Sequence, residues 1–515
     1  MKKVNQLLAG VCLLGALSCS NDEQLLLDQS TDVLTIEETV QSKKFLSIDE
    51  INKIIDKSFY DKQSFSWDDV PANVLWSASV HGGEMITVGY GDKGESFHQE
   101  RSSRISEMQN DIINIVQSNE NKSRSSLKVK ADDILNVIDI EVSKLETIQE
   151  LRATSNVRYL EPNGYSFYEL SAPKEAKQAT KQQTRDAGCD NSGSTINSND
   201  SRTISPGAEL PWTFDFHNIE AAWSQSTGQG VTIGIIDTGL SPNQSLLGSN
   251  FGDGTSVNNR TVEKYGTYID SSWWWATGTD GPNDQCGHGT KMAAAALAPR
   301  NNDRLPVGVA YNANLVMYRG TSDVLLNDYH ERKGVSDALI ALADRDDVKI
   351  ISMSIGYTWS IGNVRDAVEY AYSRGKLIFA AGGTSTSFTN WYPVIFPASM
   401  SETVAVTGIT DGSGYTQCDV CHDGSQIEFT MVMQRDSDDS RTSPTLGFNN
   451  GQADYTGGSS VATATTAGVA ALVWSKYPNW SREQVLNRMR STADLSGNTS
   501  NNYGYGNVNA SLAVQ

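Results

Sequence analysis

The pattern of apolar and polar residues changes character near residue 205 of this 515-residue chain. Beyond that point, short continuous apolar runs alternate with stretches of helical periodicity. Runs such as VTIGIID (231–237) and KLIFAAGG (376–383) are typical of strands whose two faces are both buried. Patterns such as NVRDAVEYAYSRG (363–375) predict helices between them. The alternation predicts an α/β domain over residues 205–515, built on a doubly wound, mostly parallel sheet.

A smaller α+β module is predicted over residues 71–165, and its end is the clearest part. NVIDIEV (136–142) alternates as a strand, and the next segment, SKLETIQELRAT, carries apolar residues at helical spacing. Ser143 and Glu146 have the spacing of a capping box at the start of that helix. NVRYLEP (156–162) returns as a strand, so the module is expected to end in a β-α-β unit.

The regions that flank these two domains are expected to be an export signal, a polar tether and a linker. A basic start and a short apolar run ending at Cys19 predict an export signal over residues 1–18. Its end resembles a bacterial lipoprotein signal, in which Cys19 is lipidated; ordinary cleavage with a soluble product is the alternative. Residues 19–70 are expected to be a tether followed by a region of uncertain structure. Residues 166–204 have the composition of a linker.

The charge of the chain limits its partners. With 61 acidic and 41 basic side chains, the net charge is −20. Nucleic-acid binding needs clustered basic residues, and the sequence has no long basic run, so no nucleic-acid partner is expected. No apolar stretch after the signal is long enough to cross a bilayer. The expected membrane contact is therefore the N-terminal lipid, in the outer membrane or at the surface of a bacterial cell.

Three stretches place reactive side chains at the ends of predicted elements. Asp237 closes a buried strand, and His288, flanked by glycines, opens an Ala-rich helix. Ser459 and Ser460 stand at the start of a helix of small residues in GGSSVATATTAG. Each alone is also typical of a turn or a helix cap. Together, in the order Asp, His, Ser on one α/β domain, they favour a catalytic set.

The segments DTG, GHGT and GSSVA, which contain these residues, match three signature blocks of the subtilisin-like serine proteases, or subtilases, so residues 205–515 resemble that family. The module ending in NVRYLEP resembles the family's inhibitory propeptide. The resemblance implies an endopeptidase made as a zymogen, acting on proteins or peptides. Ser460 is the implied nucleophile, His288 the general base and Asp237 the residue that orients the imidazole. Ser459 takes the place of the family's Thr.

The same resemblance implies how a substrate is bound. Ser354, Ile355 and Gly356 would form an edge strand that pairs with the substrate backbone, and Ala380 to Gly382 would line the primary specificity pocket. Plain buried strand fits both segments equally well. No cofactor is needed for the implied chemistry and no metal site is predicted. Structural calcium is common in the family, but its ligands cannot be assigned from this sequence.

One position departs from the family. Subtilases usually have Asn where this chain has Gly383, and that Asn donates to the oxyanion; losing such a donor costs about 10²- to 10³-fold in rate. Thr384, Ser385 or Asn390 is expected to supply a substitute donor. The alternative is a catalytically impaired binding protein on the subtilase fold.

Two further motifs have competing interpretations. CDVCH (418–422) fits c-type haem attachment, but a local disulfide between Cys418 and Cys421 is favoured because nothing nearby suggests a second axial ligand. A pairing of Cys189 with Cys286 is a weaker hypothesis. For SSWWW (271–275), packing inside a long loop is favoured over a substrate platform.

Overall fold

The computed structural model describes residues 43–97, 101–167, 189–257, 259–384 and 393–515. The chain divides into two units, Met1–Ser42 and Lys43–Gln515, and all described residues belong to the second. The expected export signal, the lipidation site Cys19 and the beginning of the tether lie outside the described residues. So do most of the expected linker and the two candidate donors Ser385 and Asn390.

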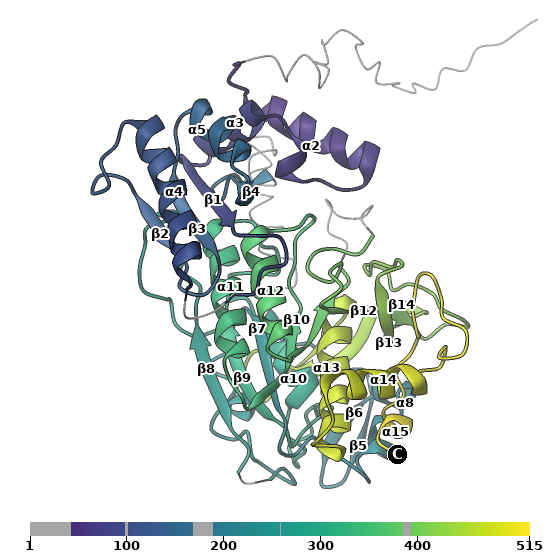
Figure 1. The fold of residues 1–515 in the computed structure, drawn as a ribbon. Coiled ribbons are helices and arrows are strands. Elements are labelled where there is room, and N and C mark those ends of the chain that lie inside the picture. Colours follow the sequence, from purple (N-terminus) through teal and green to yellow (C-terminus); the bar gives the residue numbers. More distant parts are fainter. Residues whose placement is uncertain (1–42, 98–100, 168–188, 258, 385–392) are drawn as a thin grey trace, which may run out of the picture. The chain divides into compact units, whose positions relative to one another are not determined.

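A nine-stranded sheet forms the centre of the C-terminal domain, in the order β15-β14-β13-β12-β11-β10-β7-β9-β8 (Figure 1). All neighbouring strands from β8 to β13 are parallel, and β14 and β15 add an antiparallel end. The predicted doubly wound α/β fold is therefore confirmed. The strands are β7 (Thr232–Asp237), β8 (Val262–Gly266), β9 (Asn314–Arg319), β10 (Val348–Met353), β11 (Leu377–Ala381), β12 (Val404–Thr410), β13 (Ile427–Arg435), β14 (Asp438–Leu446) and β15 (Ala453–Thr456).

Helices cover both faces of this sheet because its strands alternate their apolar side chains between the faces. In β7, Ile236 packs in the same hydrophobic cluster as α11 (Tyr329–Ala343) and α12 (Gly362–Ser373). Ile233 and Ile235 belong to a second cluster, in which the longer helices are α10 (His288–Leu297), α13 (Gly458–Lys476) and α14 (Arg482–Thr492).

Shorter elements complete the C-terminal domain. Its leading hairpin joins β5 (Ser201–Ile204) to β6 (Ala208–Pro211), and the remaining short helices are α8 (Thr213–Phe216), α9 (Ile219–Ala222), η2 (Ser245–Leu247) and α15 (Ala510–Ala513). Regular structure thus begins slightly before residue 205, inside the stretch expected to be a linker. In the part of the chain that the structure describes, no helix has the length and apolar character needed to cross a membrane.

The N-terminal module, residues 43–167, has a four-stranded antiparallel sheet in the order β2-β3-β1-β4. Because β1 lies between β3 and β4, the expected β-α-β unit is a split one, with α5 connecting its two outer strands. The elements are α2 (Ile48–Lys62), η1 (Trp67–Asp69), α3 (Ala72–His81), β1 (Met85–Tyr90), α4 (Ser103–Glu120), β2 (Val129–Ala131), β3 (Val137–Glu141), α5 (Leu145–Ala153) and β4 (Val157–Glu161).

Two local features of the module differ from the sequence-based expectation. Ordered structure begins well before residue 71, since Ile51, Ile55 and Phe59 of α2 are buried in the core of the module. The capping box expected at Ser143 and Glu146 is wrong. The backbone N–H and the hydroxyl of Ser143 donate instead to the carboxylate of Glu120 at the end of α4, so Glu120 takes the acceptor role expected of Glu146.

The module contacts α11 and α12 of the C-terminal domain through charged groups. Arg158 forms a bidentate ion pair with Asp366, with Nη1 and Oδ1 2.9 Å apart, and the Asp366 side chain is fully buried. Both carboxylate oxygens of Glu161 lie 2.9 Å from the backbone N–H of Gly362, which begins α12. Further pairs are Tyr329 with Asp139 and Lys333 with Asp132.

The expectation that the three tryptophans of 271–275 pack in the core is wrong. Trp273 is 62% exposed, and Trp274 and Trp275 are half-buried and stack on each other with ring centroids 3.8 Å apart. Lys128 of the N-terminal module lies 5.8 Å from the ring centroid of Trp273. None of the three lines the cavity described below, so a substrate platform is not supported either.

Candidate active site

Asp237 and His288 meet where β7 ends and α10 begins. His288 Nδ1 lies 2.8 Å from Asp237 Oδ1, and that oxygen also accepts the backbone N–H of Thr238 at 2.8 Å. Asp237 is completely buried and His288 is 4% exposed. A carboxylate held in this way fixes the proton of the imidazole on Nδ1 and leaves Nε2 free to accept one.

A second buried carboxylate, Asp284, organises the turn before His288. It accepts the backbone N–H groups of Cys286 and Gly287 at 2.9 and 2.8 Å, and both the N–H and the hydroxyl of Thr290. It also accepts the hydroxyl of Thr238, which follows Asp237 directly. Burial raises the pKa of Asp284, against the effect of these hydrogen bonds. Asp284 therefore ties the end of β7 to the start of α10.

The two adjacent serines have different surroundings. Ser459 is completely buried, and its Oγ accepts the backbone N–H of Gly383 at 3.1 Å. Ser460 is partly exposed in the first turn of α13, and its carbonyl accepts the Ser354 hydroxyl at 2.9 Å. Ser459 thus links two chain segments, while the side chain of Ser460 is free to face a cavity.

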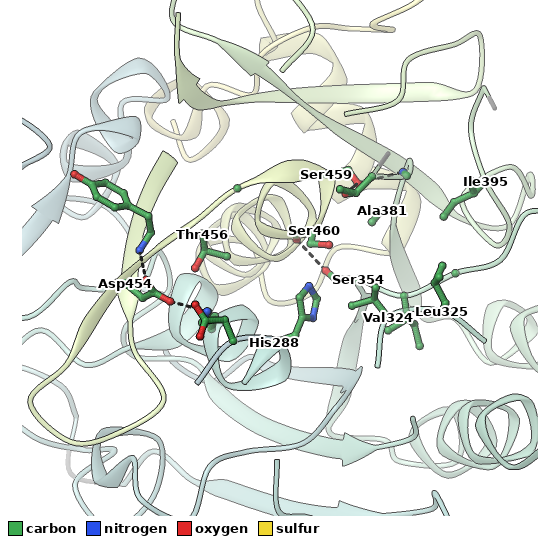
Figure 2. A pocket seen from close by; sticks show the side chains of 18 of the residues that line it. His288, Val324, Leu325, Ser354, Ala381, Ile395, Asp454, Thr456, Ser459 and Ser460 are labelled. Atoms are coloured by element: carbon green, nitrogen blue, oxygen red, sulfur yellow. Dashed lines mark hydrogen bonds and ion pairs between the residues drawn. The ribbon is translucent and has the colours of Figure 1, made fainter. Parts of the chain in front are cut away.

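That cavity has a volume of about 480 Å³ and is lined by both His288 and Ser460 (Figure 2). Its size is within the range of small-ligand sites. Most of the residues expected to bind substrate also line it: Ser354, Ile355, Gly356, Ala381, Gly383 and Thr384. The cavity therefore gathers residues that are up to 270 positions from one another in the sequence, from Asp190 to Ser460.

The expected edge strand is already paired within the chain. The N–H of Gly356 donates to Val324 O at 2.9 Å, and the carbonyl of Gly356 accepts the N–H of Leu326 at 3.1 Å. Ser354 and Ile355 lie beyond the end of β10 and are both buried. An extended substrate can pair with Gly356 only after these two hydrogen bonds open.

Gly383 lies next to the imidazole of His422. Its φ is +130°, and a Cβ built there would overlap His422 Nδ1. His422 is 2% exposed, and burial lowers its pKa, so the ring is neutral near pH 7. A side chain at position 383, Asn included, therefore has no room unless His422 moves. Of the three candidate donors, Thr384 lies in the part of the chain that the structure describes, and its hydroxyl is 3.2 Å from Ser459 Oγ.

Both expected cysteine pairs are within bonding distance. The sulfur atoms of Cys418 and Cys421 are joined, and so are those of Cys189 and Cys286. With its two sulfur atoms bonded to each other, the C-x-x-C-H motif has no thiol to attach a haem, so the haem alternative is not supported. The second bond places Cys189 beside the turn that Asp284 organises.

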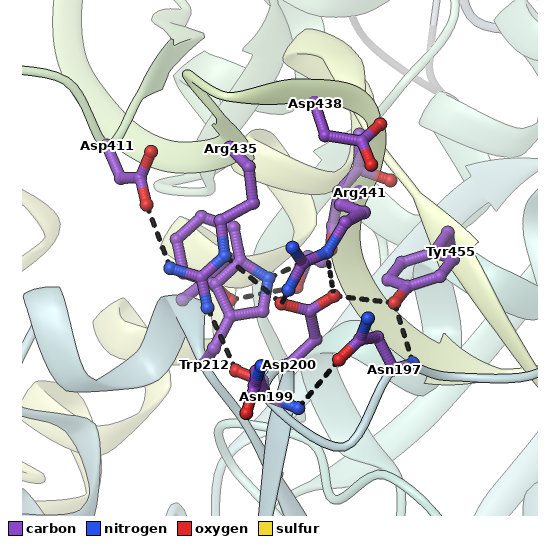
Figure 3. Close-up of polar contacts among 12 residues, drawn as sticks. Asn197, Asn199, Asp200, Trp212, Asp411, Arg435, Asp438, Arg441 and Tyr455 are labelled. Carbon is purple, nitrogen blue, oxygen red and sulfur yellow. Dashed lines mark hydrogen bonds and ion pairs between the residues drawn. The ribbon is translucent and has the colours of Figure 1, made fainter.

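The residues after Cys189 are fixed to the C-terminal domain, and we call residues 189–200 the anchor segment. Figure 3 shows its last residue, Asp200, between Arg435, Arg441 and Tyr455. The Asp200 carboxylate is completely buried and accepts Arg435 Nε at 3.1 Å, Arg441 Nε at 2.7 Å and Tyr455 Oη at 2.6 Å. Burial alone would raise the pKa of Asp200, but these hydrogen bonds outweigh it and hold the pKa below its usual value.

Sequence reasoning did not identify several polar residues around the cavity. Lys291, one turn after His288, forms an ion pair of 2.6 Å with Asp454 in β15, and both side chains are about 5% exposed. Asp190 and Ser194 of the anchor segment also line the cavity. For Asp284, a signal was present, since an acid four residues before a glycine-flanked His is well placed to cap that helix start. The others come together only through the tertiary fold.

No metal-binding cluster is apparent in the described ranges: no three or more His, Cys, Asp or Glu side chains gather as metal ligands there. No residues are therefore assigned to the structural calcium that the sequence resemblance allowed.

Comparison with known proteins adds to this geometry. A model described as the subtilase family matches residues 228–506. Subtilisin DY of Bacillus licheniformis is 30% identical over 295 residues, which cover 56% of this chain and 92% of that protein. Alkaline elastase YaB of a Bacillus strain is 29% identical over 317 residues, 59% of this chain and 70% of that protein. The solved structure of an epidermin leader peptide processing serine protease from Staphylococcus aureus covers 84% of this chain and 99% of its own, with 18% identity and a TM-score of 0.55.

Proposed function

Because the chain belongs to the subtilase family, we propose that it is an exported serine endopeptidase that hydrolyses peptide bonds in proteins or peptides. The observation that carries the proposal is the 2.8 Å hydrogen bond between His288 Nδ1 and the buried Asp237, beside a cavity that Ser460 also lines. Ser460 is the nucleophile, His288 the general base and Asp237 the residue that orients it.

In the proposed reaction, Ser460 Oγ attacks the peptide carbonyl carbon while His288 Nε2 takes the hydroxyl proton. The imidazolium is stabilised by Asp237 and returns the proton to the amine nitrogen as the C–N bond breaks. A water molecule then attacks the acyl-enzyme by the same route, with His288 again as base. The Asp284 cluster keeps the imidazole in position through both steps, because it fixes the turn from which His288 projects.

The negative charge on the carbonyl oxygen needs donors, and Gly383 supplies no side chain. The backbone N–H of Ser460, in the first turn of α13, is one donor, and the positive end of that helix adds to it. We propose that a second donor comes from Thr384, Ser385 or Asn390; of these, Thr384 lies in the part of the chain that the structure describes, and it lines the cavity.

We further propose that the N-terminal module is an inhibitory propeptide and that the chain is processed after it. The module packs on α11 and α12, whereas the anchor segment is bound to the C-terminal domain by a disulfide and by Asp200. Cleavage is expected between residues 168 and 188, ahead of Cys189. Lipidation of Cys19 would hold the unprocessed chain, and after cleavage the module alone, at the membrane.

Mass spectrometry of the mature N-terminus, compared between the wild type and Ser460→Ala, tests self-processing. The wild type is expected to lose its module within residues 168–188, and Ser460→Ala is expected to stay full length. Ser459→Ala is the matched control, because it removes the adjacent hydroxyl, and this variant is expected still to be cut. Identical trimming of wild type and Ser460→Ala would exclude self-processing.

The second candidate function, a binding protein with impaired catalysis, is favoured by one observation, the absence of a side chain at Gly383. A fluorophosphonate probe distinguishes the two. Covalent labelling at Ser460 in the processed protein, lost in His288→Ala, is expected of the enzyme. Processed protein that stays unlabelled at Ser460 would support the binding protein.

A further inference from the structure

The cavity has two chemically different ends. Figure 2 shows Val324, Leu325 and Ile395 on one side of Ser460 and His288. On the other side it shows Asp454 and Thr456, and there the wall is polar. The polar wall also contains Asp190, Ser194 and Lys291.

The anchor segment forms part of this polar wall and is fixed there at both edges. Toward α10, Cys189 is bonded to Cys286, and Asn191 Nδ2 donates to Gln285 O at 3.1 Å. Gly287, at φ +93°, approaches the carbonyl of Asp190 so closely that a Cβ would come within 2.5 Å of the oxygen. This edge therefore lies directly beside the turn that presents His288.

The second edge of the anchor segment lies along β15, just before the candidate nucleophile. The N–H of Ser194 donates to Ala453 O at 2.9 Å, and its hydroxyl donates to Asp454 Oδ1 at 2.6 Å. The N–H of Asn197 donates to Tyr455 Oη at 2.9 Å. The segment thus spans from the base to the strand that precedes Ser460, as a built wall of the cavity.

One carboxylate on this wall lacks a cation. Asp454 and Lys291 neutralise each other at 2.6 Å. Asp190 has no ion pair within 4 Å among the residues that the structure describes, and it is exposed. The N–H and the hydroxyl of Ser192 hold the pKa of Asp190 below its usual value, with a smaller contribution from Lys291. The polar end of the cavity therefore carries an unneutralised negative charge at neutral pH.

If Ser354 to Gly356 and Ala381 contact the acyl half of a substrate, the opposite, polar end receives the half that leaves. We propose that the anchor segment forms a subsite for the first two residues after the scissile bond, and that Asp190 selects a lysine or arginine there. This inference rests on the proposed peptidase function.

The test uses the processed wild-type protein and internally quenched peptides that differ only at these two positions, with Arg, Ala or Glu. We expect kcat/KM to be about 5- to 20-fold higher for Arg than for Glu, and the ratio to fall as salt is added. Equal cleavage of the Arg and Glu peptides at low salt would overturn the inference. A p-nitroanilide of the same acyl half carries no residue after the scissile bond, so failure to hydrolyse both this compound and all of the peptides would instead overturn the peptidase function.

Two variants of Asp190 test whether this residue causes the preference for Arg over Glu. Asp190→Asn is expected to bring the Arg to Glu ratio below about 2, and Asp190→Lys to reverse it. Asp438→Asn is the matched control, because Asp438 accepts the N–H and hydroxyl of Ser440 just as Asp190 accepts those of Ser192, but it lies outside the cavity. It should leave the ratio unchanged. A ratio that stays the same in Asp190→Asn would exclude Asp190 as the selecting residue.

Discussion

The N-terminal module and the anchor segment both precede the main part of the C-terminal domain in the sequence, and both contact it, but they are attached by different chemistry. The module is held by side-chain contacts with α11 and α12, and one of its contact groups, Glu161, has a pKa of about 7. The anchor segment is held by a covalent bond and by Asp200, whose pKa is lowered. The first attachment weakens within the physiological pH range, and the second does not.

Because of this difference, the module is able to dissociate after cleavage, whereas the anchor segment remains bound to the C-terminal domain. Cleavage between residues 168 and 188 would leave the module held by non-covalent contacts alone. The same cut leaves the anchor segment bonded at Cys189 and buried at Asp200. If the module is the propeptide that we propose, its boundary with the mature protein coincides with this change in the chemistry of attachment.

The largest expected effect comes from removing the charge of Asp200. Asp200→Asn removes the charge that Arg435 and Arg441 share, although Arg435 keeps its ion pair with Asp411, and losing hydrogen bonds to a buried carboxylate costs about 1.5–3 kcal/mol. The free energy of unfolding, measured by denaturant titration in a Ser460→Ala background, is expected to fall by that amount. Asp438→Asn, on the same hairpin but exposed, should change it by less than about 0.5 kcal/mol. Equal effects of the two variants would show that Asp200 contributes no more to stability than an exposed carboxylate does.

An intermediate effect is expected from pH, acting through Glu161. Burial raises its pKa to about 7, against the hydrogen bond from Gly362 and the charges of Arg365 and Arg332, while Asp68 acts with burial. The packed module therefore binds a proton that the free module, with a pKa near 4.5, releases. The resulting stabilisation is complete below about pH 4.5 and is lost as pH rises through 7.

The measurement uses a Ser460→Ala chain with a site for a sequence-specific protease inserted between residues 168 and 188. After cutting, the dissociation constant of the module is expected to rise about 10- to 100-fold between pH 4.5 and 7.5. Glu161→Gln should flatten this dependence. A module that binds more weakly at low pH than at pH 7.5 would contradict the assignment.

The smallest expected effect comes from Lys128, which lies over the exposed ring of Trp273 at 5.8 Å. A cation–π contact at an exposed site contributes about 0.5–1 kcal/mol. Lys128→Ala should therefore raise the dissociation constant of the cut module only about 2- to 5-fold. Lys57→Ala, an exposed lysine of α2 paired with Asp61 of the same helix, is the control and should have no effect. A change above about 30-fold would mean that the exposed contacts, rather than the buried ones, hold the module.

The central sheet and its helices could be predicted because their signals are local. A strand buried on both faces, such as VTIGIID, is apolar throughout, and its boundaries agree closely with β7. Asp237 was predictable as a site residue since it ends such a strand, where ligands bind in this class of fold. His288 and Ser460 begin helices next to the same edge of the sheet. The fold thus brings together what the sequence places at element ends.

The remaining features depend on contacts between distant residues, which no local pattern records. Asp200 meets partners 235 to 255 positions away, and the imidazole beside Gly383 comes from His422, 39 positions on. The failed capping box at Ser143 has the same cause, because the distant Glu120 accepts both the backbone N–H and the hydroxyl of Ser143. The sequence shows a glycine in place of the usual Asn at position 383. It does not show that the imidazole of His422 occupies the space that an Asn side chain would need.

The bond between Cys189 and Cys286 has a consequence for the ends of the processed protein. Cys286 is two residues from His288, so the proposed cleavage ahead of Cys189 would leave an amino-terminal end whose Cys189 is bonded close to the candidate active site. Successive cuts would shorten that end from the outside until the crosslinked cystine stops them. Repeated trimming would then give every molecule the same first residue, and a population with ragged ends would converge on one length.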